Sequence, residues 1–166
     1  MSQLEVVQIP CLTDNYGYLV HDSESKFTAS IDSPALDAIE DALRQNGWVL
    51  THIFNTHHHY DHTGANLELK KRWNCKIIGS EKDSDRIPGL DEGVNDQDVF
   101  NFGNHEVKVF DVSGHTIGHI SFYFPREEKL FCGDALFALG CGRIFEGTPA
   151  QMWESLQKLE KLPEDT

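Results

Sequence analysis

The 166-residue chain lacks several features that would place it in other classes of protein. Its first ten residues, MSQLEVVQIP, contain neither a basic segment nor a long apolar one, so no signal peptide is predicted. No apolar run approaches the roughly 18 residues that span a bilayer, which argues against a membrane protein. The four cysteines are scattered without a C-x-x-C pair, so we expect reduced thiols and a cytoplasmic location.

Basic residues are also few. Lysine and arginine number 14 against 27 aspartates and glutamates, a formal net charge of −13. This acidity argues against nucleic acid and anionic membranes as the main partner. We expect a monomer whose partner is a small molecule. Hydrophobic residues at 39% and charged ones at 25% are typical of a globular protein. The length fits one domain with a sizeable core.

The first third of the chain is predicted to be rich in strands. These strands cover residues 4–10, 15–22 and 26–32. A helix follows over 33–47, in which Ser33 can cap, Pro34 fits the first turn and Gly47 ends the helix. Residues 48–55 are β-rich and apolar, as in a buried strand that leads directly into a cluster of histidines.

The second half of the chain alternates in the same way. Strands are predicted at 75–80, 105–113, 119–125 and 129–137, and helices at 64–74 and 148–162. The acidic stretch 81–98 looks like a loop. In the last helix, Thr148 and Gln151 fit a capping box. The expected buried stripe of that helix is Trp153, Leu156 and Leu159. This order favours an α/β fold in which helices cover sheets.

The histidine cluster spells H-x-H-x-D-H with His57, His59, Asp61 and His62. In an extended chain, side chains two apart point the same way with Cα atoms roughly 6.5–7 Å apart. Two imidazoles at that spacing can converge on one ion at about 2.0–2.1 Å from each nitrogen. Asp61 and His62 diverge, so they are better placed to hold a second ion. This set suits Zn²⁺, with iron or manganese possible, and outweighs the alternative of a polar surface loop.

The neighbours of these four residues carry weaker signals. His58 lies between ligand positions and should point away, as a spacer or a support. Tyr60 is interpreted as a wall residue, and the Thr56 hydroxyl can orient a ligand. The remaining histidines without a pattern are expected at the surface or the core edge: His21, His52 and His105.

Two later positions offer further ligands. His115 lies in the turn SGHTIGH and Asp134 in FCGDALF, each after an apolar β run. Loops at strand ends commonly gather at one edge of a sheet to form a site. An aspartate has two oxygens and can bridge two cations. For His119 a structural hydrogen bond is favoured over a ligand role.

Three segments together resemble a known family. They are THHHYDH (56–62), GHTIGH (114–119) and GDALFALGCGRIFEGT (133–148). They are similar to the metallo-β-lactamase superfamily and, through GCGRIFEGT, to its glyoxalase II group, the hydroxyacylglutathione hydrolases. The resemblance covers nearly the whole chain. It implies a metallo-β-lactamase-like αββα sandwich, with β-sheets packed together and helices outside.

The resemblance also implies a ligand set for two Zn²⁺ ions per chain. One metal would be held by three histidines, His57, His59 and His115. The second would be held by Asp61 and His62. Asp134 would bridge the two ions, and Asp61 and Asp134 would be the catalytic carboxylates.

Substrate contacts follow from the same resemblance. Arg143 occupies a position where the family often has a lysine or arginine that contacts the glycine carboxylate of glutathione. Phe145 falls where some members have a tyrosine. The family has a further histidine in a GHEYT-like segment and a C-terminal helical domain, and neither occurs in this sequence. Pro163 ends the last helix where such a fold would continue, so residues 1–166 are expected to be an incomplete catalytic domain with its C-terminal part missing.

The implied reaction is hydrolysis of S-D-lactoylglutathione, a 2-hydroxyacylglutathione, to D-lactate and glutathione in methylglyoxal detoxification. Two cations about 3.5–4 Å apart would activate a shared water for attack on the thioester. Two alternatives remain: another enzyme of this fold, such as a persulfide dioxygenase with a single iron, or an inactive fragment that serves as a binding module. A serine hydrolase is disfavoured because no G-x-S-x-G elbow is present.

Overall fold

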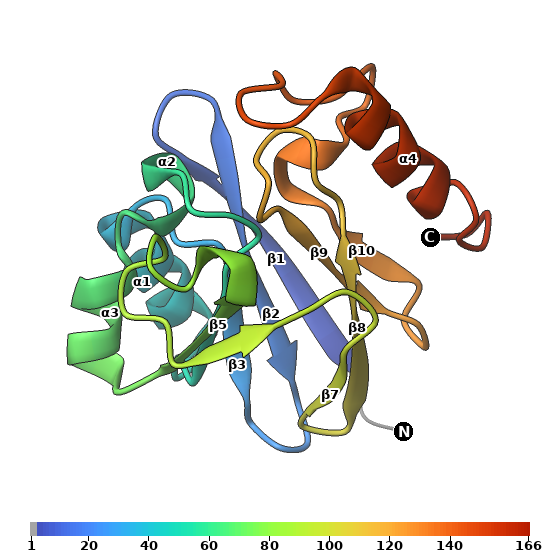
Figure 1. Ribbon diagram of the computed structural model, residues 1–166. Helices are drawn as coiled ribbons and strands as arrows, with labels where there is room; N and C mark the ends of the chain where they lie inside the picture. The colour runs from blue at the N-terminus through green and yellow to red at the C-terminus, as the bar shows by residue number, and fades with distance from the viewer. Residues whose placement is uncertain (1–2) are drawn as a thin grey trace.

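Two β-sheets packed face to face form the centre of the protein, and helices cover their outer faces (Figure 1). The computed structural model describes residues 3–166. The first sheet has the order β1 (Leu4–Cys11), β2 (Asn15–Asp22), β3 (Thr28–Ile31), β4 (His52–Phe54), β5 (Lys76–Ser80) and β6 (Glu92–Val94). The second has the order β10 (Lys129–Phe131), β9 (Ile120–Phe124), β8 (His105–Asp111) and β7 (Val99–Phe102). This is the predicted αββα architecture.

The helices are short. They are α1 (Leu36–Asn46), α2 (Tyr60–Thr63), α3 (Asn66–Trp73) and α4 (Pro149–Leu159), with 3₁₀ turns η1 (Glu81–Asp83) and η2 (Gly133–Ala135). Within residues 3–166, none of them has the length and apolar character needed to cross a membrane.

The pairing of the first sheet brings several strand ends to one edge. β1, β2 and β3 pair antiparallel, whereas β3, β4, β5 and β6 pair parallel. Ile31 lies opposite Phe54, and Phe54 lies opposite Ile78. Because parallel strands end at the same edge, the segments after β3, β4 and β5 start side by side.

Apolar side chains fill three layers. Between the sheets, the largest fully buried residues are Phe54, Phe102, Phe122 and Phe124. α1 and α3 cover the first sheet through Ile39, Leu43 and Leu69. α4 packs Leu159 against Val112 and Ala135 beside the second sheet. Because the core is packed on both sides of each sheet, the loops at the sheet edge rest on a rigid base.

Most predicted helix ends are confirmed. Gly47 ends α1 with φ 67°, a left-handed conformation that suits glycine. Thr148 and Gln151 form the expected capping box of α4. The predicted cap Ser33 is wrong, because α1 begins after Ala35 and the Ser33 hydroxyl instead donates to the Asn66 side chain.

Other predictions failed where tertiary contacts outweigh local pattern. The stretch 81–98 is not a simple loop, since it holds η1 and β6. Trp153 is 60% exposed, whereas Met152 and Ser155 are buried on α4. His21 and His105 are buried rather than superficial: His21 bonds to Thr28, and His105 bonds to Glu127.

Candidate metal centre

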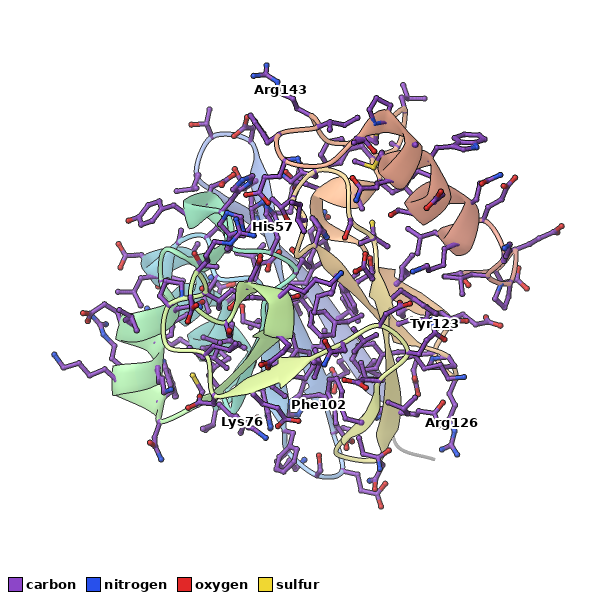
Figure 2. The ribbon with its side chains drawn as sticks, viewed as in Figure 1. His57, Lys76, Phe102, Tyr123, Arg126 and Arg143 are labelled. Carbon is purple, nitrogen blue, oxygen red and sulfur yellow. The ribbon has the colours of Figure 1, made fainter. Side chains whose placement is uncertain are left out.

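The predicted ligands lie on loops that leave the carboxyl ends of strands. The loop after β4 carries His57 and His59, and the short helix α2 that follows it carries Asp61 and His62. The turn between β8 and β9 carries His115, and η2 after β10 carries Asp134. Figure 2 shows His57 inside the protein near this edge. The two sheets are joined there, because the Ile120 N–H donates to the Thr56 carbonyl at 2.9 Å.

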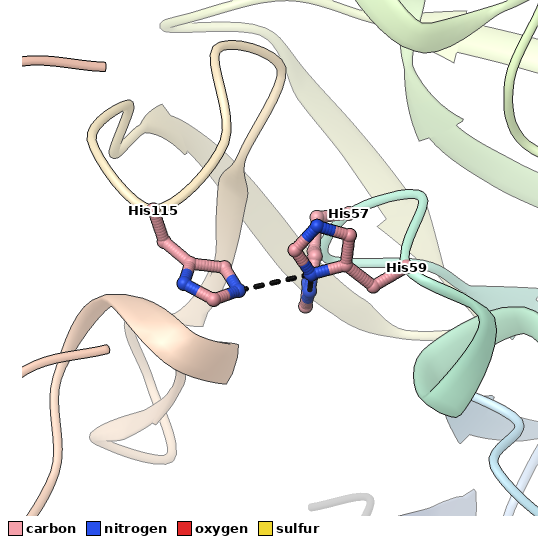
Figure 3. A group of neighbouring side chains, drawn as sticks. All are labelled: His57, His59 and His115. Atoms are coloured by element: carbon pink, nitrogen blue, oxygen red, sulfur yellow. Dashed lines mark hydrogen bonds between the residues drawn. The ribbon is translucent and has the colours of Figure 1, made fainter. Parts of the chain in front are cut away.

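Three histidines converge on one point (Figure 3). His59 Nδ1 is 3.1 Å from His57 Nε2 and 3.0 Å from His115 Nε2. Tetrahedral nitrogen ligands at about 2.0–2.1 Å from a zinc ion lie about 3.3 Å from one another. The nitrogens of this three-histidine group are therefore spaced nearly as a tetrahedral cation requires.

Hydrogen bonds on the far sides of the rings fix which nitrogens carry protons. The Thr56 hydroxyl donates to Asp32 Oδ2 at 2.8 Å, so it accepts from His57 Nδ1 at 3.0 Å. His115 Nδ1 donates to the Arg143 carbonyl at 2.6 Å. Both Nε2 atoms then present lone pairs to the shared point, which is the arrangement that a cation needs.

The charge state of the rings agrees with this assignment. Burial and the neighbouring histidines hold the pKa of His57 well below its ordinary value. The same two causes lower the pKa of His59. These two imidazoles are neutral near pH 7, and neutral imidazole is the form that binds metal.

A second donor group adjoins the first and consists of His57, His62 and Asp134. His62 Nε2 is 3.3 Å from Asp134 Oδ1. The other nitrogen of His62, Nδ1, donates to Asp32 Oδ2 at 2.8 Å. Burial opposes a charge on His62, but the carboxylates of Asp32 and Asp134 outweigh burial and raise its pKa to about 10. Burial likewise opposes the charge on Asp134, but His62 keeps the pKa of Asp134 low. This group therefore carries an internal ion pair.

The Asp134 carboxylate lies between the two groups. Its Oδ1 faces His62 Nε2 at 3.3 Å, and its Oδ2 faces His115 Nε2 at 3.4 Å. One oxygen is thus directed at each group, the geometry of a bridging ligand. The backbone of Asp134 is fixed as well, because its N–H donates to His119 Nε2 at 3.1 Å.

Asp61 lies at the rim of the second group. Its side chain is 48% exposed, and its Oδ2 is 3.7 Å from His62 Nε2. The side-chain amide of Asn15, the first residue of β2, donates to the same oxygen at 2.9 Å. The structure thus brings together all six predicted ligands, with Asp61 the most loosely placed.

Asp32 is the functional residue that the sequence analysis missed. It is buried and accepts three hydrogen bonds, from the Thr56 N–H, the Thr56 hydroxyl and His62 Nδ1. It supports one histidine of each donor group, directly for His62 and through Thr56 for His57. The sequence did hold a signal for Asp32, because this residue ends the strand predicted over 26–32. If that strand runs parallel to the strand before the histidine cluster, the two strands end side by side, and Asp32 lies next to the cluster.

The expectations for His58 and His119 fit the structure, whereas Tyr60, expected to be a wall residue, is 82% exposed. His58 turns away from the donor groups and bonds Asp83 Oδ2 at 2.9 Å. His119 is fully buried, burial lowers its pKa to about 3, and it makes the structural hydrogen bond to Asp134. Gly133 has φ 49°, and a side chain there would place its Cβ 2.6 Å from Thr56 Oγ1. The approach of η2 to Thr56 therefore requires glycine.

The predicted substrate contacts border the three-histidine group. The Phe145 ring, 58% exposed, lies edge-on to His59 and His115 with centroids 5.5 and 5.3 Å away. Arg143 extends away from the body of the protein (Figure 2), with its guanidinium carbon 5.5 Å from the Phe145 ring centre. On the other side, a cavity of about 850 Å³ reaches His62, Asp134 and the turn before β2. The second donor group is therefore open to a ligand of moderate size.

Comparison with solved structures places this architecture among proteins of the metallo-beta-lactamase fold. The BLEG-1 B3 metallo-beta-lactamase superposes with a TM-score of 0.86 at 24% identity, covering 96% of this chain and 88% of that one. TTHA1623, solved in a di-iron-bound form, gives a TM-score of 0.81 at 24% identity over 95% and 87%. At these identities the likeness shows the fold alone.

Sequence comparison is more specific. The hydroxyacylglutathione hydrolase of Rhizobium etli is 52% identical over 166 residues, all of this chain and 65% of that protein. This chain thus spans about two thirds of the relative's length. The sequence profile described as the Metallo-beta-lactamase superfamily matches residues 27–166. Together with the shared fold, this match shows that the chain belongs to the metallo-beta-lactamase superfamily.

Proposed function

We propose that this chain is the metal-binding part of a hydroxyacylglutathione hydrolase, a glyoxalase II. The observation that carries the proposal is the placement of Asp134, with one oxygen toward each of two adjoining donor groups. The name of the Rhizobium etli relative supports the choice of reaction. The substrate would be S-D-lactoylglutathione, and the products D-lactate and glutathione.

The donor groups suit two divalent cations, with zinc the best match to their chemistry and iron or manganese as alternatives. His57, His59 and His115 would hold one ion, Asp61 and His62 the other, and Asp134 both. When bound, such a pair supplies an activated water and Lewis-acid stabilisation of the developing oxyanion.

The chain's own residues have distinct tasks in this proposal. Thr56 holds His57 in the tautomer that exposes its Nε2 atom, and Asp32 holds the His62 ring so that its Nε2 faces Asp134. Asp61, held by Asn15, would orient the attacking oxygen from the rim. Phe145 would form an apolar wall beside the thioester, and Arg143 would attract the glycine carboxylate of glutathione.

The test is to load the protein with zinc and follow hydrolysis of the thioester by its ultraviolet absorbance. His57→Ala and Asp134→Asn should each lower both the bound zinc and the rate, by at least about 100-fold in rate. Asp85→Asn, at an exposed aspartate, is the matched control and should change neither. Retention of metal and activity in His57→Ala would refute the proposal.

A second candidate is another enzyme of this fold with one iron, such as a persulfide dioxygenase. It is favoured by the difference in charge between the groups, because His57 and His59 can accept a cation without releasing protons. Binding of a single iron together with oxygen consumption would select this candidate. Tight binding of glutathione thioesters without turnover would instead indicate a binding module.

A further inference from the structure

Charged side chains outside the donor groups join the loops that carry the three-histidine group. Asp83, in η1, is fully buried. Its Oδ2 accepts from His58 Nδ1 at 2.9 Å, and its Oδ1 accepts from Arg86 Nη2 at 2.5 Å. His58 sits between the predicted ligands His57 and His59, so the buried carboxylate holds that loop from behind.

Arg86 continues the connection to a second loop. Its Nη1 donates to Glu146 Oε1 at 2.5 Å, and its Nη2 donates to Glu146 Oε2 at 3.3 Å. The same Nη1 is 3.3 Å from His58 Nε2. Burial of Asp83 and the forked contact with Glu146 distinguish this cluster from an ordinary surface ion pair.

Glu146 then reaches the turn that carries His115. Its Oε2 accepts from the Ile117 N–H at 2.8 Å. The N–H groups of Phe145 and Glu146 donate to the His115 carbonyl at 3.1 and 3.4 Å. A side chain at Gly118 would collide with the Asp83 carboxylate, so the turn and η1 are in close contact.

These contacts give Arg86 a special place in the network. It lies between the loop of His57 and His59 on one side and the turn of His115 on the other, although these segments are distant in the sequence. The hydrogen bonds with Glu146 and Asp83 raise the pKa of Arg86, and Arg86 lowers the pKa of Glu146. Both groups therefore stay charged across the range in which the protein would work.

We propose that Arg86 is a positioning residue for the metal site, which sets the spacing between His115 and the pair His57 and His59. The proposal rests on the proposed function, because it presumes that the three-histidine group holds a cation. Residues that orient metal ligands without touching the metal typically change its affinity by about 10–100-fold when they are replaced.

The experiment compares three variants for zinc affinity and thermal stability. Arg86→Met keeps most of the aliphatic stem but removes the charge and the fork. Glu146→Gln keeps an oxygen for the Ile117 N–H and loses only the charge. Arg44→Met, which breaks the exposed pair of Arg44 with Asp41, is the matched control. Affinity is measured by competition with a chromophoric chelator, and Co²⁺ absorption reports the geometry of the ligands.

Arg86→Met should weaken zinc binding to the three-histidine group about 10-fold or more and change the Co²⁺ spectrum, with a smaller change for Glu146→Gln and none for Arg44→Met. Wild-type affinity and an unchanged spectrum in Arg86→Met would overturn the positioning role, even if its melting temperature fell. If Arg86→Met does not fold, the same two measurements on Glu146→Gln decide. A wild-type chain that binds no zinc would instead overturn the proposed function.

Discussion

The two donor groups adjoin each other yet differ in charge. In the three-histidine group, burial lowers the pKa of His57 and of His59, so these ligands are neutral. In the second group, His62 has a pKa of about 10 because Asp32 and Asp134 flank it. The first group is therefore ready for a cation, whereas the second must first lose a proton from His62.

The largest expected effect separates the two groups by removing one ligand from each. His59→Ala should abolish tight binding at the three-histidine group, and His62→Ala should abolish only the second site. Loss of a direct ligand should weaken the affected site by more than about 100-fold, since even indirect supports contribute about 10–100-fold. Zinc content after dialysis and a zinc titration of each variant measure the effect.

Tyr60→Phe is the control for this pair, because Tyr60 lies between them in sequence and is 82% exposed. It should behave as wild type. If His59→Ala and His62→Ala lose the same zinc site and their remaining sites have the same zinc affinity, the two groups are not separate, and the comparison is wrong.

A smaller effect concerns protons. Below its pKa of about 10, His62 is protonated, so zinc must displace a proton to enter the second group. Second-site affinity should fall about tenfold for each unit by which pH is lowered through the neutral range, while first-site affinity changes less. Each second-site ion should release about one proton, which a pH indicator in weakly buffered solution detects.

Asp32→Asn sharpens this test. Loss of the carboxylate should bring the pKa of His62 back toward its ordinary value, so proton release near neutral pH should shrink. The control variant Asp85→Asn, at an exposed aspartate, should leave the proton release unchanged. Equal proton release for both sites in the wild type would contradict the difference in charge.

The smallest effect is expected at the rim of the second group. Asn15→Ala removes the 2.9 Å hydrogen bond to Asp61 and frees that carboxylate to rotate. One hydrogen bond of about 1 kcal/mol corresponds to about a fivefold weaker second site, with the first site unchanged. A zinc titration resolves the two sites. The control is Asn46→Ala, which removes a side-chain hydrogen bond from Asn46 to the Ala42 carbonyl at the end of α1. An equal loss of second-site affinity in this control would contradict the role of Asn15.

Which side chains gather at the candidate metal centre could be predicted in part from the sequence, because their pattern is local. His57, His59, Asp61 and His62 are spaced by the geometry of one loop after one strand. The positions of His115 and Asp134 needed the further expectation that strand ends gather at one edge, which the two sheets satisfy.

The residues that hold these side chains in place could not be predicted from the sequence, because their hydrogen-bond partners are distant in the chain. Asp32 bonds Thr56 across 24 positions, and Arg86 bonds Glu146 across 60. Neither residue belongs to a periodic pattern or a motif. The prediction that Ser33 caps α1 failed for a related reason, because its hydroxyl donates to the side chain of Asn66, which is distant in the sequence.

The ion pair between Asp32 and protonated His62 bears on the order of events during biosynthesis. Protonated His62 lies between the buried carboxylate of Asp32 and the partly exposed carboxylate of Asp134, and its positive charge offsets the repulsion between them. The newly made polypeptide can thus fold before it binds metal. An ion that later enters the second group would replace the proton on His62.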